Sequence, residues 1–155
     1  MILAIDPDTT ATGWAYGDLH GPRAVGAVKP RNRLDLPWVR AWDMAQQVYS
    51  LKTFDWASIS HVVIEMPGRQ GPPNRQGQAM YGVAPGVFYC RFRPFNAVGV
   101  PVHEWTRGQP KDKRAEMMRQ AYPVYERVSG LDRGKHMADA VGLLVWWCAE
   151  QLAHV

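Results

Sequence analysis

Four side chains that commonly bind metal ions stand out at three places along the chain. Asp6 and Glu65 each come at the end of a short apolar run, which is typical of a buried strand. His136 and Asp139 lie three residues apart in a third segment. A carboxylate at the edge of a hydrophobic core loses hydration, and a nearby cation offsets that cost. These residue types therefore predict a site for Mg²⁺ or Mn²⁺, which prefer oxygen ligands.

The spacing of the four residues is compatible with one shared site. If the strands that end at Asp6 and Glu65 are adjacent and parallel, the two carboxylates converge, because neighbouring strands lie about 4.8 Å apart. Residues three apart, such as His136 and Asp139, project from the same face of a helix. Asp139 lies in a predominantly apolar helix start, so a charge at this position needs a specific reason.

Each of these residues also has an ordinary structural explanation. Asp6 precedes a proline and can open an Asx turn, and Glu65 can be an exposed strand end. His136 and Asp139 both suit the first turn of a helix, where the helix dipole favours a carboxylate. Taken together, four ligand-type residues at two strand ends and one helix start indicate a metal site, since converging carboxylates repel each other without a cation.

The pattern of apolar residues predicts an α/β fold that carries this site. We expect strands over residues 1–5, 12–16, 23–28, 61–64 and 99–104, and helices over 36–51, 78–92, 110–122 and 137–152, with a bend or break at Pro85 and Gly86. Residues 66–77 are rich in Gly, Pro and polar side chains and predict a loop. This order favours a mixed sheet with helices on both faces, in a single domain over residues 1–155.

Composition indicates a compact protein with a mildly basic surface. The formal net charge of +4 favours a polyanionic partner, although proteins without such partners often have a similar balance. Cys90 and Cys148 lie far apart and in no metal-binding spacing, so we expect neither a disulfide framework nor a cysteine metal site. The apolar segment 137–149 is too short to cross a bilayer, and no secretory signal is evident, so a cytoplasmic location is expected.

Four segments resemble the RuvC family of Holliday junction resolvases, and they occur in the family's order. The segment Ile5–Ala15, IDPDTTATGWA, resembles the family's opening strand and turn. Val63-Ile64-Glu65 resembles its second carboxylate strand, and the residues Gly77-Gln78-Ala79 with Gly82-Val83 resemble the helix that follows. His136-Met137-Ala138-Asp139-Ala140 resembles its C-terminal metal motif. The likeness extends over nearly the whole chain.

This resemblance implies a ribonuclease H-like fold with a mixed five-stranded sheet flanked by helices. It also implies a homodimer and magnesium-dependent cleavage of two opposed strands in a four-way DNA junction. Asp6, Glu65, His136 and Asp139 fall on the family's metal-binding positions, with two ions expected at each active site. His136 either binds a metal or holds the attacking water. Lys113 resembles the lysine of the family's catalytic helix and is the preferred basic residue near the scissile phosphate.

Two features depart from the family pattern. Asp8 stands where the family usually has Gly, which indicates either a turn residue that tolerates positive φ or an additional carboxylate near the metals. The turn is the preferred interpretation. The loop after Glu65 lacks, over residues 66–75, the aromatic residue that in the family helps to unstack junction bases.

Basic and polar residues in two segments are candidates for DNA contacts. Arg69, Gln70 and Arg75 in the loop can reach the strand-exchange point, or they can simply be solvated. The second group, which can contact phosphates or form a solvated helix face, comprises Arg107, Lys111, Lys113 and Arg114.

Other functions remain open on the sequence alone. One is a less selective nuclease that cuts flaps or other branched DNA with the same metals. Another is a catalytically inert, structure-specific DNA-binding module, and a third is a relative that acts on RNA. The apolar residues of 78–92 are candidates for the dimer interface, although each also suits the core.

Overall fold

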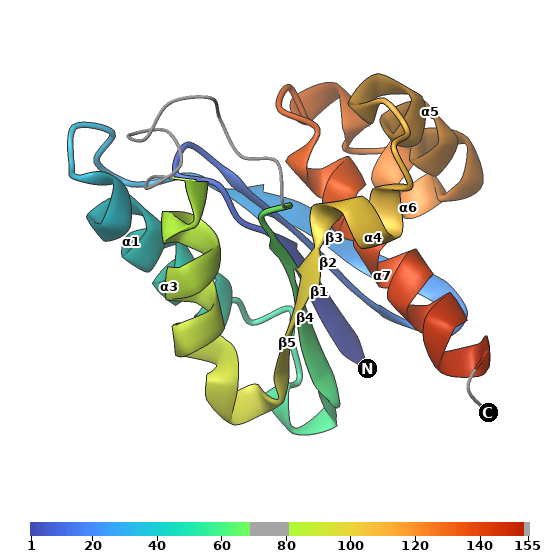
Figure 1. The fold of residues 1–155 in the computed structure, drawn as a ribbon, viewed down its shortest axis with the longest axis horizontal. Helices are drawn as coiled ribbons and strands as arrows, with labels where there is room; N and C mark the ends of the chain where they lie inside the picture. The colour runs from blue at the N-terminus through green and yellow to red at the C-terminus, as the bar shows by residue number, and fades with distance from the viewer. Residues whose placement is uncertain (69–80, 154–155) are drawn as a thin grey trace.

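A twisted sheet of five strands forms the centre of the molecule (Figure 1). The computed structural model describes residues 1–68 and 81–153. The strands are β1 (Ile2–Asp6), β2 (Thr12–Asp18), β3 (Gly21–Val28), β4 (His61–Met66) and β5 (Ala97–Pro101). Their spatial order is β3-β2-β1-β4-β5, with antiparallel pairing from β1 to β3 and parallel pairing of β1, β4 and β5. The predicted mixed five-stranded sheet is confirmed.

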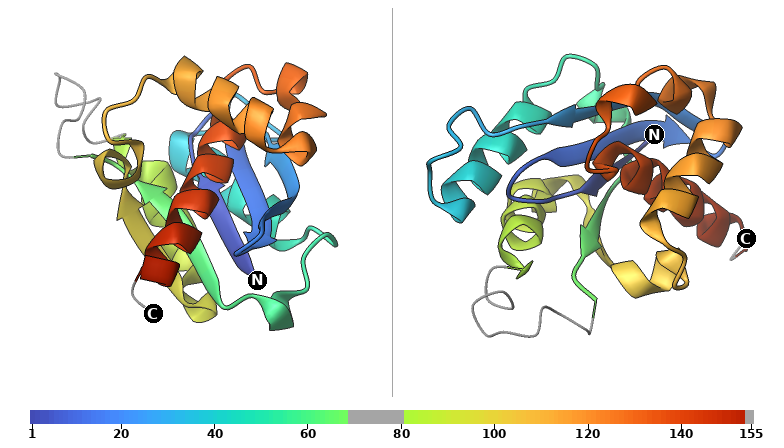
Figure 2. Two further views of the ribbon diagram at one scale, coloured as in Figure 1. Left: turned by 90° about the vertical axis from the view of Figure 1, so that its right-hand side faces the viewer. Right: turned by 90° about the horizontal axis from the view of Figure 1, so that it is seen from above.

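Helices cover both faces of the sheet, as Figures 1 and 2 show. On one face lie α1 (Pro37–Tyr49) and α3 (Val83–Phe92), and on the other lies α7 (His136–Ala153). The helices α4 (Val102–Thr106), α5 (Lys111–Ala121) and α6 (Pro123–Glu126) lie on the side of α7. Three short 3₁₀ helices complete the described chain: η1 (Trp56–Ser58), η2 (Arg93–Phe95) and η3 (Ser129–Leu131).

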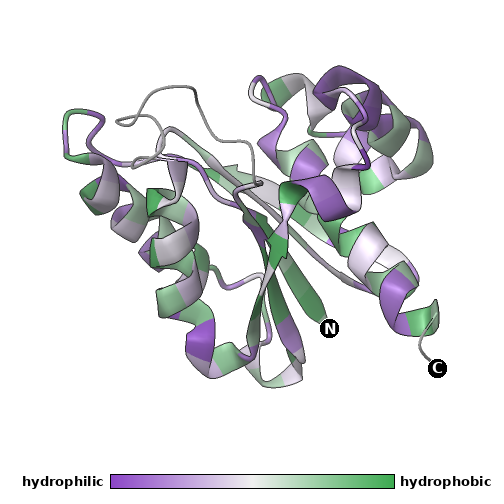
Figure 3. Cartoon of the chain, in the orientation of Figure 1, coloured by the Kyte–Doolittle hydropathy of each residue, from purple (hydrophilic) through white to green (hydrophobic). Residues whose placement is uncertain are grey.

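The hydrophobic core has two parts because side chains alternate across the sheet. Leu3 and Ile5 of β1 pack with α1 and α3, whereas Ile2 and Ala4 pack with α7. This burial on both faces explains why the first strand is apolar at every position before Asp6. In Figure 3 the hydrophobic colouring accordingly runs along the central strands.

Two secondary-structure predictions were wrong. The expected strand 99–104 ends at Pro101 and gives way to α4, since the partner strand β4 ends at Met66, opposite Pro101. The helix around Pro85 and Gly86 runs on without a break. Pro85 lies in the first turn of α3, where its missing N–H has no helical acceptor to lose. Residues 78–80 of that predicted helix lie outside the described residues.

Two further predictions concern the cysteines and membrane-spanning helices. Cys90 is exposed and Cys148 is buried, and both are free thiols, as expected. Over the described parts of the chain, we find no helix with the length and apolar character needed to cross a membrane.

Candidate active site

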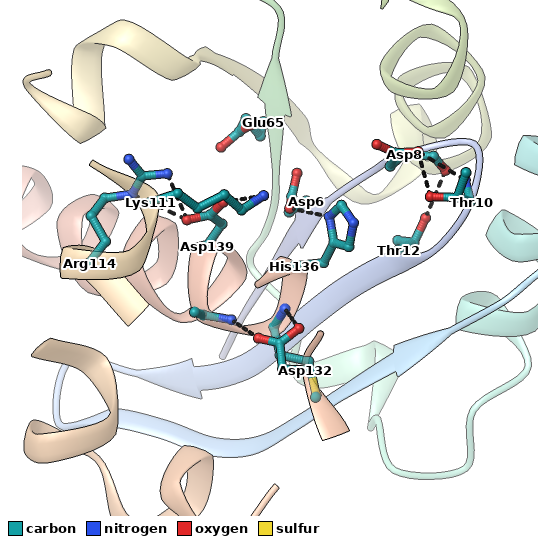
Figure 4. A network of polar contacts seen from close by, with 12 residues as sticks. Asp6, Asp8, Thr10, Thr12, Glu65, Lys111, Arg114, Asp132, His136 and Asp139 are labelled. Atoms are coloured by element: carbon teal, nitrogen blue, oxygen red, sulfur yellow. Dashed lines mark hydrogen bonds and ion pairs between the residues drawn. The ribbon is translucent and has the colours of Figure 1, made fainter. Parts of the chain in front are cut away.

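Asp6, Glu65, His136 and Asp139 converge at the carboxyl ends of β1 and β4 (Figure 4). The two strands are parallel neighbours, with Ile5 opposite Ile64, so the residues that follow lie side by side. The start of α7 brings His136 and Asp139 to the same edge of the sheet. A cavity of about 370 Å³ opens here, and its walls include Asp6, Glu65, His136 and Lys111 of α5.

Asp6 is buried and accepts a hydrogen bond from His136. The distance from its Oδ2 to Nδ1 of the imidazole is 2.8 Å. Gly13 makes this contact possible, because a Cβ there would lie 2.1 Å from the carbonyl oxygen of His136. Since Gly13 pairs with Asp6 in the sheet, its missing side chain lets α7 begin directly over the strand end. The glycine of the IDPxxxxxG pattern is thus a close-packing residue.

Asp139 is the most deeply buried acid of the site and is held by two cations. Its exposed fraction is 2%. Lys111 Nζ lies 2.9 Å from one carboxylate oxygen, and Arg114 Nη2 lies 2.9 Å from the other. Arg114 is itself fixed by a hydrogen bond to the carbonyl oxygen of Gln109 and lies over the ring of Trp105. The helix α5 thereby carries its positive charge into the acidic cluster.

Glu65 is a partly buried carboxyl group whose pKa is strongly raised. Burial raises its pKa to about 9, and the nearby charges of Asp6 and Asp139 add to the effect. Among the described residues, its side-chain hydrogen bond comes from Trp105 Nε1, at 2.9 Å. Trp105 packs closely over Gly142 of α7, where a Cβ would come within 2.7 Å of the indole. Glu65 is therefore protonated near neutral pH unless a cation is added.

The pKa values of the two bases of the site, Lys111 and His136, are raised as well, which favours their charged forms. Burial opposes the charged form of Lys111, but Asp6 and Asp139 outweigh it and raise the pKa of the ammonium. Burial likewise opposes protonation of His136, and the hydrogen bond and charge of Asp6 outweigh it, so the pKa of the imidazole is also raised. Both shifts favour the protonated, positively charged forms of these groups beside the carboxylates.

Asp132 fixes the start of α7 and was not singled out from the sequence. Its buried carboxylate accepts hydrogen bonds from the backbone N–H groups of Met137, at 3.1 Å, and Ala138, at 2.9 Å. It also accepts one from the hydroxyl of Tyr125, at 3.0 Å. A capping residue normally stands immediately before the helix. Asp132 lies four positions before His136, so the usual capping pattern did not reveal it.

Asp8 forms a turn without the backbone conformation that we expected. Its carboxylate accepts hydrogen bonds from the backbone N–H and the hydroxyl of Thr10, at 2.9 and 3.0 Å. In the described residues, positive φ outside glycine occurs at Asn96, Arg107 and Lys135, so the expectation of positive φ at Asp8 was wrong. The Asx turn satisfies the backbone instead. Asp8 also lines the active-site cavity.

The basic residues predicted near DNA are spread over different environments. Lys111 and Arg114 lie in the acidic cluster, whereas Lys113 is exposed on α5 and is not part of the cavity wall. Arg107, after α4, is exposed and lies 4.0 Å from Glu150. Arg69, Gln70 and Arg75 lie outside the described residues. The lysine closest to the carboxylates is therefore Lys111.

The donor set suits a hard divalent cation, although its present ion pairs compete with one. Within residues 1–68 and 81–153, no three His, Cys, Asp or Glu side chains are arranged to hold one ion as they stand. Two of the carboxylates are instead paired with bases: Asp139 with Lys111 and Asp6 with His136. Three carboxylates that share one buried site, one of them protonated for want of a counter-charge, nevertheless have the chemistry of a magnesium or manganese site.

Comparison with known structures supports the fold. RuvC of Thermus thermophilus in complex with a Holliday junction substrate superposes with a TM-score of 0.70 and 17% identity, covering 98% of this chain and 95% of that chain. A second structure of Thermus thermophilus RuvC gives a TM-score of 0.61 and 15% identity, covering 98% and 96%. No protein-family model matches the sequence, and no curated relative matches it. The chain thus has a RuvC-like fold of the ribonuclease H type.

Proposed function

We propose that this protein is a magnesium- or manganese-dependent endonuclease that resolves four-way DNA junctions by paired, symmetric incisions. The observation that carries this proposal is that Asp6, Glu65, Lys111 and His136 line one cavity, with Asp139 directly behind it in an ion pair with Lys111. The RuvC-like fold supports the choice of substrate, since one structural neighbour is described as a complex with a Holliday junction.

Asp6, Glu65 and Asp139 are the side chains that would hold the metal, with two ions in each active site. His136 would either complete the ligand set or hold the attacking water. Divalent ions in such sites activate water and stabilise the oxygens of the phosphodiester that is cut. Metal binding would require Glu65 to release its proton and Lys111 and His136 to give up their contacts with Asp139 and Asp6. Lys111 would then be free for the substrate, and so would His136 if it is not itself a ligand.

In this mechanism Lys111 and His136 act on the phosphodiester and on the attacking water. The ammonium of Lys111 enters the cavity from α5, where it can neutralise charge that develops on the scissile phosphate. His136 lines the same cavity and has a raised pKa, which suits a group that holds a proton near the water. Arg114 remains with Asp139 and keeps α5 in position.

DNA binding outside the cavity is assigned to exposed cations. Lys113 on α5 and Arg107 after α4 are both exposed and suit contacts with backbone phosphates. Arg69, Gln70 and Arg75 remain candidates for contacts near the strand-exchange point. Arg114 has a different role, because its side chain is largely buried against Asp139.

We also propose a homodimer, because a four-way junction has approximate two-fold symmetry and paired incisions need two related active sites. The exposed side of α3 and Tyr81, two positions before the helix, are the candidate interface. Tyr81 and Tyr89 are exposed there, whereas Phe88 and Phe92 belong to the core. Sedimentation analysis of the wild type and of a Tyr89→Glu variant tests this assignment, and an unchanged dimer would place the interface elsewhere.

The decisive test compares cleavage of a synthetic four-way junction, a flap and a matched duplex with Mg²⁺ or Mn²⁺. The proposal expects junction cleavage well above the other substrates, 5′-phosphate products, and loss of cutting in Asp6→Asn with binding retained. Equal rates on the flap and the junction would favour the less selective nuclease. Junction binding with no cutting by the wild type in either metal would favour the inert DNA-binding module.

A further inference from the structure

A second cavity, of about 320 Å³, shares a wall with the active site. His136 lines both cavities, and Figure 4 places its ring between Asp6 and the turn that contains Thr10. The walls of this second cavity include Thr10 and three cationic residues. These are Lys29, Arg33 and Arg40.

The positive charge of the second cavity is not neutralised from within the described chain. No Asp or Glu is among the described residues that line it, and none of the ion pairs formed by described residues includes Lys29, Arg33 or Arg40. The nearby acid Asp43 is engaged elsewhere, because it accepts hydrogen bonds from the backbone N–H of Arg31 and from Gln47. Three cations therefore face one cavity without a counter-ion from these elements.

Arg40 is anchored in a way that leaves hydrogen-bonding capacity unused. Its Nη1 donates to the carbonyl oxygen of Arg33 at 3.4 Å, which is a long contact. Its Nε is buried and has no acceptor among the described residues. A guanidinium held this way has donors to spare, and phosphate oxygens are the acceptors that its planar geometry fits best.

We propose that Lys29, Arg33 and Arg40 form a subsite for a backbone phosphate of the DNA strand that is cut. This inference rests on the proposed nuclease function. Because His136 lines both cavities, a strand with one phosphodiester in the active-site cavity can place a neighbouring phosphate in the second cavity. Such a contact positions the strand without reading sequence, and it orients the scissile bond against the carboxylates.

The test removes two positive charges from this subsite and compares DNA affinity with that of a control variant that lacks two positive charges far from the site. Lys29→Gln/Arg33→Gln is the test variant, since both side chains are exposed and the core is untouched. Lys52→Gln/Arg93→Gln is the matched control. Lys52 follows α1 and Arg93 lies in η2, both exposed and at the opposite end of the sheet from the site.

Affinity for a labelled four-way junction is measured in EDTA between 50 and 200 mM salt. One lost phosphate contact in each protomer of the proposed dimer lowers the steepness of log affinity against log salt by about 1.8, so the wild type should lose on the order of tenfold more affinity than the test variant over this range. The control should keep the wild-type slope. Thermal unfolding of each variant confirms that the fold is intact.

The outcomes separate the subsite from the function on which it rests. If the wild type binds and cuts the junction while the test variant and the control share the wild-type slope, the subsite is refuted and the nuclease proposal stands. If the wild type neither binds nor cuts branched DNA, both are refuted. A reduced slope confined to the test variant supports the subsite.

Discussion

Three carboxylates in this site are balanced unequally by positive charge. Lys111 and Arg114 pair with Asp139, and His136 pairs with Asp6. From the residues that the structure describes, Glu65 receives a side-chain hydrogen bond from the neutral indole N–H of Trp105 and no ion pair, and its pKa rises to about 9. Because no cation pairs with Glu65 among the described residues, this carboxyl group keeps its proton, and a bound metal ion would release it.

Replacing Lys111 separates its role from that of Lys113. We expect Lys111→Gln to lower the rate of junction cleavage at saturating DNA by on the order of 100-fold, because a positioned charge near the phosphate is lost. Lys113→Gln should weaken binding by about threefold through one lost phosphate contact, with the loss disappearing at saturation. Single-turnover cleavage checks both variants. If Lys113→Gln lowered the cleavage rate more than Lys111→Gln does, Lys113 would be the basic residue that acts on the scissile phosphate.

The raised pKa of Glu65 predicts how stability depends on pH without metal. Between its ordinary value of 4.5 and about 9, the folded chain keeps a proton that the unfolded chain has released. Stability therefore falls as pH rises through this interval. Glu65→Gln should remove part of the loss and raise the Tm at pH 8 in EDTA by about 2–4 °C. Glu104→Gln, at an exposed glutamate of α4, is the control and should leave the Tm unchanged.

The acidic residues could be predicted because the sequence places them next to apolar segments, where a carboxylate loses hydration. The cations that pair with them could not be predicted in the same way. A carboxylate after an apolar strand or inside an apolar helix needs a counter-charge wherever the chain places it. Which cation supplies it depends on how α5 lies across α7, and local sequence does not determine that packing. For this reason Lys113 was preferred from the family pattern, although Lys111 and Arg114 are the residues that contact Asp139.

At the scale of elements, the site depends on where α7 begins. The capping contacts of Asp132 fix its first turn, and the absence of a side chain at Gly13 lets that turn rest on β2. A shift of this helix start would separate His136 from Asp6 and move Asp139 relative to α5. The helix start therefore links the stability of the fold to the geometry of the site.

Gly13→Ala tests this link. The new Cβ would overlap the carbonyl group of His136, so we expect a loss of about 1–3 kcal/mol in the free energy of unfolding, or more if the backbone cannot adjust. Gly86→Ala is the matched control, since its Cβ would meet nothing within 4 Å and its helical position should gain about 0.4–1 kcal/mol. Urea unfolding measures both. Equal stability of Gly13→Ala and the wild type would contradict the close approach.

The elements themselves followed largely from hydrophobic periodicity. Strands buried on both faces read as continuous apolar runs, and α1, α5 and α7 have the expected spacing. The error at residues 102–104 arose because Val102 continues an apolar run, while the strand ends where its partner β4 ends. Sheet registry is a long-range property, so the sequence around Pro101 did not reveal it.

At the scale of the whole molecule, the fold gathers charges from distant parts of the chain at one end of the sheet. The antiparallel β1–β3 unit carries Asp6 and Lys29, and the parallel strands and following helices carry Glu65, Lys111 and Asp139. Acidic and basic cavities thus lie next to each other on either side of His136. This arrangement suits a ligand that brings both cations to the carboxylates and anions to the basic wall, as metal-bound DNA does.

Metal binding should therefore stabilise the whole fold, and more strongly at higher pH. An ion would have to displace the proton of Glu65, so its affinity should rise as pH approaches 9. It would also compete with the ammonium of Lys111, whose raised pKa keeps it charged over this range. At a concentration about 100 times the dissociation constant, binding adds about 2.7 kcal/mol to stability. We expect Mn²⁺ to raise the Tm more at pH 8.5 than at pH 6.5. Lys111→Gln should enlarge this shift because a competing cation is gone, even though cleavage is lost, whereas Asp6→Asn should reduce it. If the shift were the same at both pH values, Glu65 would not be a metal ligand.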